Sequence, residues 1–176
     1  TDFSNSLLIG HSTTGTLDAA SANIGIGNNT LMDITSGDYN IAIGSYAGGD
    51  ITTSSANTIM GVDAGRFIST SSGSNTLIGN TTSYYNATGT YNTTLGTQAL
   101  MGASGQNNSY NTAIGGQALK AVTTGDYNIG MGYTSGDNVT SGSGNVVIGK
   151  ADVSSATGDD QLSISDGEDG SVVWMT

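Results

Sequence analysis

One short pattern recurs along almost the whole chain: an Asn, three residues of which the last is aliphatic, and then a Gly. Successive copies begin 16 to 19 residues apart, and six of the nine intervals are 17 residues. A fixed period of this length is typical of stacked coils, in which each repeat contacts only its neighbours. The copies begin at Ser6, Asn23, Asn40, Asn57, Asn75, Asn92, Asn111, Asn128, Asn145 and, in a degenerate form, Gln161.

The three residues between Asn and Gly have the character of a short strand that is buried on both faces. The third is aliphatic or Met in every copy, and the first is apolar or Thr. These two positions share one face of a strand, and the residue between them points to the other face. That middle residue is mostly small or apolar too, as in Ala42, Leu77 and Val147. One face can fill the inside of a coil, and the other needs a second cover, for which an identical chain is the simplest candidate.

The remainder of each repeat predicts turns. The Gly closes the strand where the chain must turn, with a positive φ. In several copies we expect a second short strand, at 46–48, 98–100 and 117–119, followed by a Ser/Thr/Gly/Asp turn such as 35–38. Because Asn recurs once per coil, we expect its side-chain amides to form a ladder along the stack. The ladder positions are Asn23, Asn40, Asn57, Asn75, Asn92, Asn111, Asn128 and Asn145.

The composition argues against several partners. Only 10% of the residues are charged, and the chain has 28 Gly but no Pro and no Cys, which suits the thin core of a solenoid or fibre. The net charge is −11, so we expect neither nucleic acid nor an anionic membrane surface as a partner. No apolar run approaches the roughly 20 residues that cross a bilayer, so no membrane insertion is expected.

We therefore predict an all-β chain, a parallel β-solenoid or β-roll of about ten 17-residue coils, assembled as a trimeric fibre. Coils of a parallel stack rise by roughly 4.7–4.9 Å each, so ten coils make a rod on the order of 50 Å long. The narrow coil and the two-faced strands favour a trimer or another close homo-oligomer over a lone rod. Residues 1–165 are predicted to form the solenoid shaft or tip, and residues 166–176 a C-terminal cap segment.

Two segments resemble the repeats of bacteriophage tail fibres and tailspikes, which follow the pattern TGxxNTAIGxxAL. They are Thr124–Asn128 and Tyr110–Leu119. Similar, somewhat shorter Gly-rich repeats occur in the heads of trimeric autotransporter adhesins. The resemblance covers residues 6 to about 165 and implies parallel β-stacking in a trimeric fibre. It implies a virion location for a phage fibre and a bacterial cell surface for an adhesin head.

The C-terminal segment resembles the region just before the intramolecular chaperone of many phage fibres. Acidic residues at 159–160 and 166–169 are followed by Ser171-Val172-Val173-Trp174-Met175-Thr176. In that family the chaperone begins with Ser-Asp-x-Arg-(Leu/Ile)-Lys, assembles the trimer and cuts itself off before that Ser. The resemblance implies that Thr176 is an auto-cleavage end. No chaperone sequence is present, so an arbitrary boundary at Thr176 is the alternative.

No pattern of catalytic or metal-binding residues stands out. A nucleophilic triad needs a base beside its nucleophile, and the only His, His11, is expected in a solvated turn. The acidic residues mostly occur singly in turns, where Asp is an ordinary turn former. The acidic cluster at 159–169 has neither EF-hand spacing nor the repeat of calcium β-rolls, and we expect a solvated cap. We therefore predict that the chain is not an enzyme and has no cofactor and no metal site.

The two longest intervals mark loops that leave the regular coil, within 67–74 and within 101–108. Tyr and Asn in such loops suit contact with a sugar or receptor, because aromatic faces stack on sugars and amides bond to hydroxyls. Tyr39, Tyr91, Tyr110 and Tyr127 each precede the Asn of a repeat, and packing along the outer turn is the alternative for each Tyr. The candidate binding residues are Tyr84, Tyr85, Asn86, Tyr91, Asn107, Asn108 and Tyr110.

These features favour a virion fibre segment that extends or presents the binding of a host receptor. The expected partners are two further copies of the chain and a glycan or protein on the host cell surface. A trimeric autotransporter adhesin head is the alternative. An ice-binding solenoid is suggested by the row of Thr58, Thr76, Thr93 and Thr112, but no strand carries the Thr-x-Thr pair of a flat Thr face.

Overall fold

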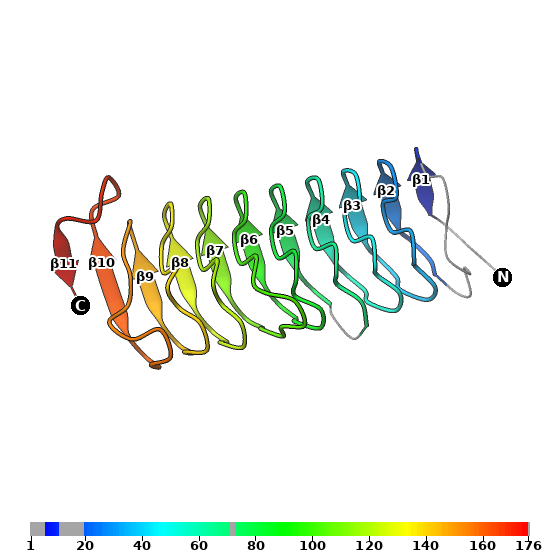
Figure 1. The fold of residues 1–176 in the computed structure, drawn as a ribbon. Coiled ribbons are helices and arrows are strands. Elements are labelled where there is room, and N and C mark those ends of the chain that lie inside the picture. Colours follow the sequence, from blue (N-terminus) through cyan, green and yellow to red (C-terminus); the bar gives the residue numbers. More distant parts are fainter. Residues whose placement is uncertain (1–5, 11–19, 71–72, 176) are drawn as a thin grey trace.

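A computed structural model of the chain describes residues 6–10, 20–70 and 73–175. Within these ranges the protein is all-β, without helices, and forms a parallel β-solenoid of about eight turns (Figure 1). The strands are β1 (Leu7–Ile9), β2 (Ile24–Ile26), β3 (Ile41–Ile43), β4 (Thr58–Met60), β5 (Thr76–Ile78), β6 (Thr93–Leu95), β7 (Thr112–Ile114), β8 (Ile129–Met131), β9 (Val146–Ile148), β10 (Leu162–Ser165) and β11 (Val173–Met175).

The strands β1 to β10 run parallel and pair in sequence order, so they form one sheet along the side of a rod (Figure 1). Each residue pairs with its equivalent in the next coil; Ile41 of β3, for example, lies between Ile24 and Thr58. The expected parallel β-solenoid is confirmed. The ten parallel strands bound nine intervals, and the first interval passes through residues 11–19, outside the described ranges. His11 therefore also lies outside them, as does Thr176.

The middle residue of each strand fills the inside of the solenoid. Ala42, Ile59 and Val147 are fully buried, and they point into the coil. The first and third residues of each strand point outward, away from this core. The two apolar faces of the repeat therefore have different roles, since one builds the core of the chain and the other forms its surface.

Large core residues fill the space beside small ones of neighbouring coils. Leu119 fills the space left by two glycines of the next coil, because a Cβ at Gly130 would lie 2.7 Å from the Leu119 Cγ and a Cβ at Gly136 would lie 3.0 Å from its Cδ2. Near the other end, a Cβ at Gly48 would lie 3.1 Å from the Cδ1 of Ile59. The core is thus close-packed although most coils contribute only a few large side chains.

The prediction of a second short strand in several repeats is wrong. The segments 46–48, 98–100 and 117–119 form turns. Tyr46, Gln98 and Gln117 have φ values of 57°, 59° and 62°, and two residues further on the backbone is left-handed again. Alternating left-handed residues cannot form an extended strand, so each coil consists of one short strand and a long chain of tight turns.

The Gly at the end of each strand is required by the stacking of the coils. From Gly27 to Gly132 these glycines have φ between 130° and 142°. A Cβ at Gly27 would lie 2.8 Å from the carbonyl carbon and oxygen of Gly44 in the next coil, closer than side-chain carbons approach backbone. Both the conformation and the space therefore admit only Gly at this position.

The Asn side chains form a buried ladder along the rod. The Oδ1 of Asn23 accepts the backbone N–H of Asn40 at 2.8 Å and its Nδ2 at 3.1 Å. Equivalent backbone bonds continue from coil to coil as far as the Gln161 N–H, which the Oδ1 of Asn145 accepts at 2.9 Å. Most of the Nδ2 groups also donate to a turn carbonyl of the next coil, as from Asn128 to Gly142 at 2.9 Å. Each buried amide therefore has partners on neighbouring coils, which its burial requires.

The chain reverses direction after β10. β11 pairs antiparallel with β10, with Met175 opposite Ile164. The connecting turn is organised by Asp166, whose Oδ1 accepts the N–H groups of Glu168, Asp169 and Gly170 at 2.9–3.2 Å, and whose Oδ2 accepts that of Val172 at 2.7 Å. These bonds, led by those from Gly170 and Val172, hold the pKa of Asp166 below its ordinary value of 3.8.

The strand-end Gly can be tested by substitution. Gly79→Ala places a Cβ against the Gly96 backbone at a φ of 142°, so we expect it to lower the free energy of unfolding by about 3 kcal/mol or more. Gly167→Ala is the matched control, because its Cβ would meet nothing within 4 Å. Chemical denaturation followed by circular dichroism measures both. Equal stability of the two variants would contradict the stacking constraint.

The Asp166 turn predicts a pH dependence. A carboxyl whose pKa is lowered by folding stabilises the fold above its ordinary pKa, and this contribution is lost as the pH falls through the lowered value. We expect the amide resonances of Gly170 and Val172 in 15N-labelled protein to be constant from pH 7 to 5 and to shift only below about 3.8. Asp166→Asn should shift them already at pH 7, whereas Glu168→Gln should not. Resonances that already shift between pH 5 and pH 4 would argue against this role, because they would show a carboxyl whose pKa is not lowered.

Candidate functional site

The first and third residues of β1–β10 form a flat apolar surface along the rod, which we call the sheet face. The parallel register aligns equivalent residues of successive coils, so the surface is continuous. No position of the sheet face carries a charged residue. Eleven of its large apolar side chains are 36–52% exposed: Leu7, Ile9, Ile24, Ile26, Ile41, Met60, Leu95, Ile129, Met131, Ile148 and Leu162.

The sheet face is large for a surface exposed to water. We estimate its apolar area at on the order of 1,000 Å² per chain, whereas the largest apolar patch of a monomeric protein is usually about 300–600 Å². The face continues into β11, where Met175 lies opposite Ile164. Val172, Val173, Trp174 and Met175 are all more than half exposed. A surface of this size and composition is typical of a protein–protein interface.

The middle of the sheet face is partly polar. Thr58, Thr76, Thr93 and Thr112 pair in register at the first strand position of four successive coils. The third position remains aliphatic or Met in these coils. The face therefore has one fully apolar row and one row that is apolar at both ends and hydroxylated in the middle.

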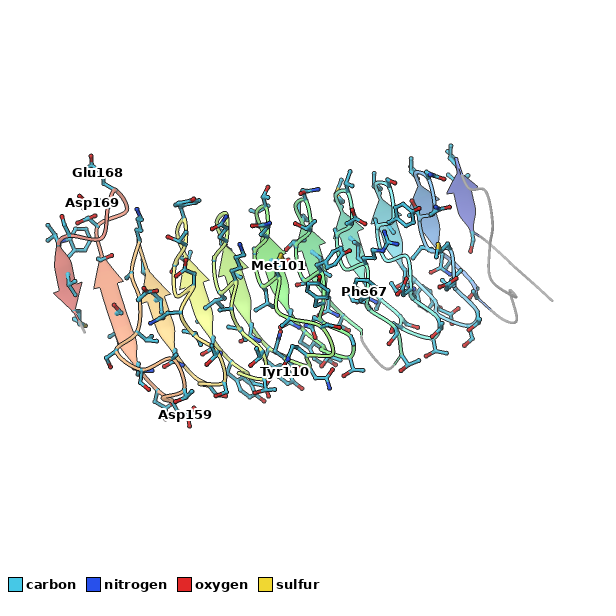
Figure 2. All side chains as sticks on the ribbon, viewed as in Figure 1. Phe67, Met101, Tyr110, Asp159, Glu168 and Asp169 are labelled. Atoms are coloured by element: carbon cyan, nitrogen blue, oxygen red, sulfur yellow. The ribbon has the colours of Figure 1, made fainter. Side chains whose placement is uncertain are left out.

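A column of Tyr residues forms the second prominent surface feature. Tyr91, Tyr110 and Tyr127 precede the ladder Asn in three successive coils, and each is 45–60% exposed. Their ring centroids are 5.3 and 4.7 Å apart, with interplanar angles of 9° and 4°. The rings are thus stacked along the rod like plates. Figure 2 shows Tyr110 among the turns at the lower edge of the rod.

The column is interrupted on one side. The two coils before Tyr91 have Ala56 and Ser74 at the equivalent position, and the coil before those has Tyr39. A cavity of about 300 Å³ lies at this interruption. Its lining residues are Thr53, Ser54, Ser55, Gly73, Ser74, Thr90 and Tyr91.

The structure divides the candidate binding residues into separate groups. Tyr91 and Tyr110 belong to the Tyr column, together with Tyr127, which the sequence-based selection omitted. Its position directly before Asn128 was the available signal. Tyr84 and Tyr85 instead pack against Phe67, with centroid distances of 5.0 and 5.6 Å. Figure 2 places Phe67 higher on the rod than Tyr110.

The Asn residues of the candidate site have different environments. Asn86 and Asn108 are buried, and the Asn86 Nδ2 donates to the Asn108 carbonyl at 2.9 Å and to its Oδ1 at 3.1 Å. The Asn86 Oδ1 accepts the Gly89 N–H at 3.0 Å. These amides join the insertion after Met101 to the preceding coil, and their expected role in contacting a ligand stays a prediction. Asn107 is exposed.

The three aromatic rings at Phe67 lie beside an ion pair. The Arg66 Nη1 donates to the Asp63 Oδ1 at 2.8 Å, and the guanidinium lies 3.9 Å from the ring centroid of Tyr46. The hydrogen bond from Arg66 to Asp63 raises the pKa of the guanidinium. Burial, and then the charge of Asp33, raises the pKa of the nearby Asp50. The contact of Arg66 with Tyr46 joins neighbouring coils, whereas the ion pair with Asp63 lies within one coil, and both are sufficiently explained by packing.

Two carboxyl groups interact near the C-terminal end of the rod. Burial, and then the neighbouring Asp152, raises the pKa of Asp137. Both residues line a cavity of about 510 Å³ that also contacts Lys150 and Asp169. Over the described ranges, no group of three or more His, Cys, Asp or Glu side chains is arranged to hold a metal ion. The acidic cluster at 159–169 includes Asp166 and Asp169, whose carboxylates accept backbone N–H groups of their own turn.

Comparisons with protein families, with curated proteins and with solved structures found no match for this chain. In the part of the chain that the structure describes, no helix is long and apolar enough to cross a membrane. The sheet face and the Tyr column are the two surfaces of the described residues that bear on function.

Proposed function

We propose that this protein is a segment of a homotrimeric virion fibre, as in a phage tail fibre, that extends or presents the binding of a host receptor. The uncovered sheet face carries this proposal. A solenoid that functions alone would leave a continuous apolar surface in water along its whole length, at a cost that grows with each coil. Burying the face against identical chains removes that cost.

The geometry suits an assembly of identical chains around a common axis. The sheet face is flat and repeats coil by coil, so copies that are aligned in height present the same side chains to one another. The number of chains follows from the resemblance to the trimeric repeats of phage fibres. In such an assembly the polar turns and the exposed Tyr column remain available on the outside.

A rod of this kind suits the mechanical role of a fibre. Successive coils are joined by the strand bonds, the Asn ladder and further side-chain bonds, such as that from the Thr123 Oγ1 to the Thr140 carbonyl at 3.1 Å. Because each coil depends on its neighbours, the rod is expected to resist local opening. Parallel stacking also gives the two ends of the rod a fixed separation.

The oligomeric state tests the proposal. We expect a mass of three chains of 17.6 kDa in sedimentation equilibrium, and migration as a trimer in SDS without heating. Ile129→Glu places a charge at an apolar position of the sheet face, so it should dissociate the assembly while the circular dichroism spectrum stays that of a β-protein. Thr124→Glu, on an exposed turn, is the matched control and should leave the trimer intact.

Two results would contradict the proposal. A wild-type chain that sediments at 17.6 kDa would show that the sheet face is not an interface. A mass of two chains would retain the interface but reject the trimeric fibre. Dissociation by Thr124→Glu to the same extent as by Ile129→Glu would show that the effect is not specific to the face.

An ice-binding surface is the second candidate, and the in-register row of Thr58, Thr76, Thr93 and Thr112 favours it. A regular row of hydroxyls on a flat sheet can order water. The neighbouring row is aliphatic, however, so the pair of Thr rows is incomplete. Thermal hysteresis that disappears in Thr93→Lys would support this candidate, and no hysteresis in the wild type would remove it.

A further inference from the structure

The interruption of the Tyr column has the shape of a binding slot. One face of the Tyr91 ring is covered by Tyr110, with the planes 9° apart. The stacked arrangement directs the other face toward the preceding coil, where the equivalent residue is Ser74. Beyond Ser74 and Ala56, the column resumes with Tyr39. Tyr91 therefore forms one end of the slot, and two coils without a Tyr at this position separate it from Tyr39.

The dimensions of the slot match a small cyclic ligand. Three coil steps separate Tyr39 from Tyr91, which corresponds to roughly 14 Å at the ordinary spacing of parallel strands. The cavity at the Tyr91 end has a volume of about 300 Å³, at the lower limit of ordinary ligand sites. One or two rings can thus be stacked in the slot at the same spacing as the Tyr rings themselves.

The lining chemistry selects the class of ligand. All seven lining residues are uncharged, and four of the hydroxyl-bearing ones, Thr53, Ser55, Ser74 and Thr90, belong to three successive coils. The aromatic face of Tyr91 carries negative charge density, which attracts the polarised C–H groups of a saccharide ring. The net charge of −11 disfavours anionic ligands, including nucleotides and acidic sugars. A neutral saccharide combines the apolar ring face and the hydroxyls that this surface can bind.

The position before the ladder Asn has a left-handed backbone also where the residue is Ala56 or Ser74, so this conformation belongs to the repeat. Tyr39 and Tyr91 have φ values of 58° and 57°, a region that is unfavourable for bulky residues. Stacking on Tyr110 stabilises Tyr91 in this conformation. Tyr39 is 67% exposed, and the equivalent positions of both neighbouring coils are Ala. Tyr39 therefore has no Tyr of the column in the coils beside it, and its exposed ring is available to a ligand.

We propose that the slot between Tyr39 and Tyr91 binds a neutral saccharide, with a sugar ring stacked on the open face of Tyr91 and hydroxyls bonded to the Ser and Thr side chains of the lining. This inference deepens the proposed function, on which it rests, by naming the receptor class as a neutral glycan. The slot lies on the turns before the ladder Asn, so every chain of an assembly carries one.

Binding to a defined panel tests the proposal. The assembled wild-type protein is applied to an array of neutral oligosaccharides built from glucose, galactose, mannose, rhamnose and N-acetylglucosamine, and hits are measured by saturation-transfer NMR. Tyr91→Ala removes the stacking face and should weaken binding at least tenfold. Ser74→Tyr adds a ring at a position whose φ of 57° already equals that of Tyr91, so it should fill the slot and abolish binding without lowering the melting temperature. Tyr127→Ala, at the far end of the column, should change the affinity less than twofold.

Three results would overturn the proposal. The first is that the wild-type protein binds none of the neutral saccharides. The second is that Tyr91→Ala and Ser74→Tyr bind as the wild type does. The third is that Tyr91→Ala changes the sedimentation mass, which would assign the Tyr column to assembly. Because the mass of the wild-type protein is measured in the same samples, a trimer without glycan binding rejects the slot alone, whereas a monomer rejects the fibre.

Discussion

The stacking of identical coils at the spacing of hydrogen-bonded strands governs this structure. Every atom of a coil must avoid its equivalent less than 5 Å away, which excludes a Cβ at the end of each strand and fixes Gly at positions such as Gly79. The same spacing lets one Asn amide bond to the next, so a buried polar side chain becomes a link between coils. The chain must reach the start of the next strand within about 17 residues, and left-handed residues allow the tight turns that this requires.

Stacking also converts the properties of single residues into surfaces. An outward Ile at one strand position becomes an apolar row when it recurs in register, and two such rows form the sheet face. Tyr residues before the ladder Asn of successive coils stack into a column of rings. Where that position is Ser or Ala, the column is interrupted and leaves a slot. Assembly and recognition are thus proposed to use different columns of one repeat, which leaves them free to vary independently.

The sequence predicted the strands and their two apolar faces, because the 17-residue period and the apolar residues of each strand can be identified from the residue types alone. It did not predict the turns between them. Tyr46 and Gln117 have no compositional signal for a left-handed backbone, and only the stacked coil imposes it. The burial of Asn86 was also missed, since it depends on the pairing of two loops 22 residues apart. Tyr127 directly precedes Asn128 in the sequence, but its stacking on Tyr110 is visible only in the structure.

The burial of the sheet face is the central claim, and a single introduced thiol tests it most directly because the chain has no Cys. Met131 is 42% exposed in the single chain, so a thiol in Met131→Cys would react readily with a maleimide if the face were open. The assembly predicts slow modification of Cys at position 131 in the native protein and rapid modification after dissociation. Thr124→Cys, on an exposed turn, gives the reference rate. Equal rates at both positions in the native protein would contradict the account.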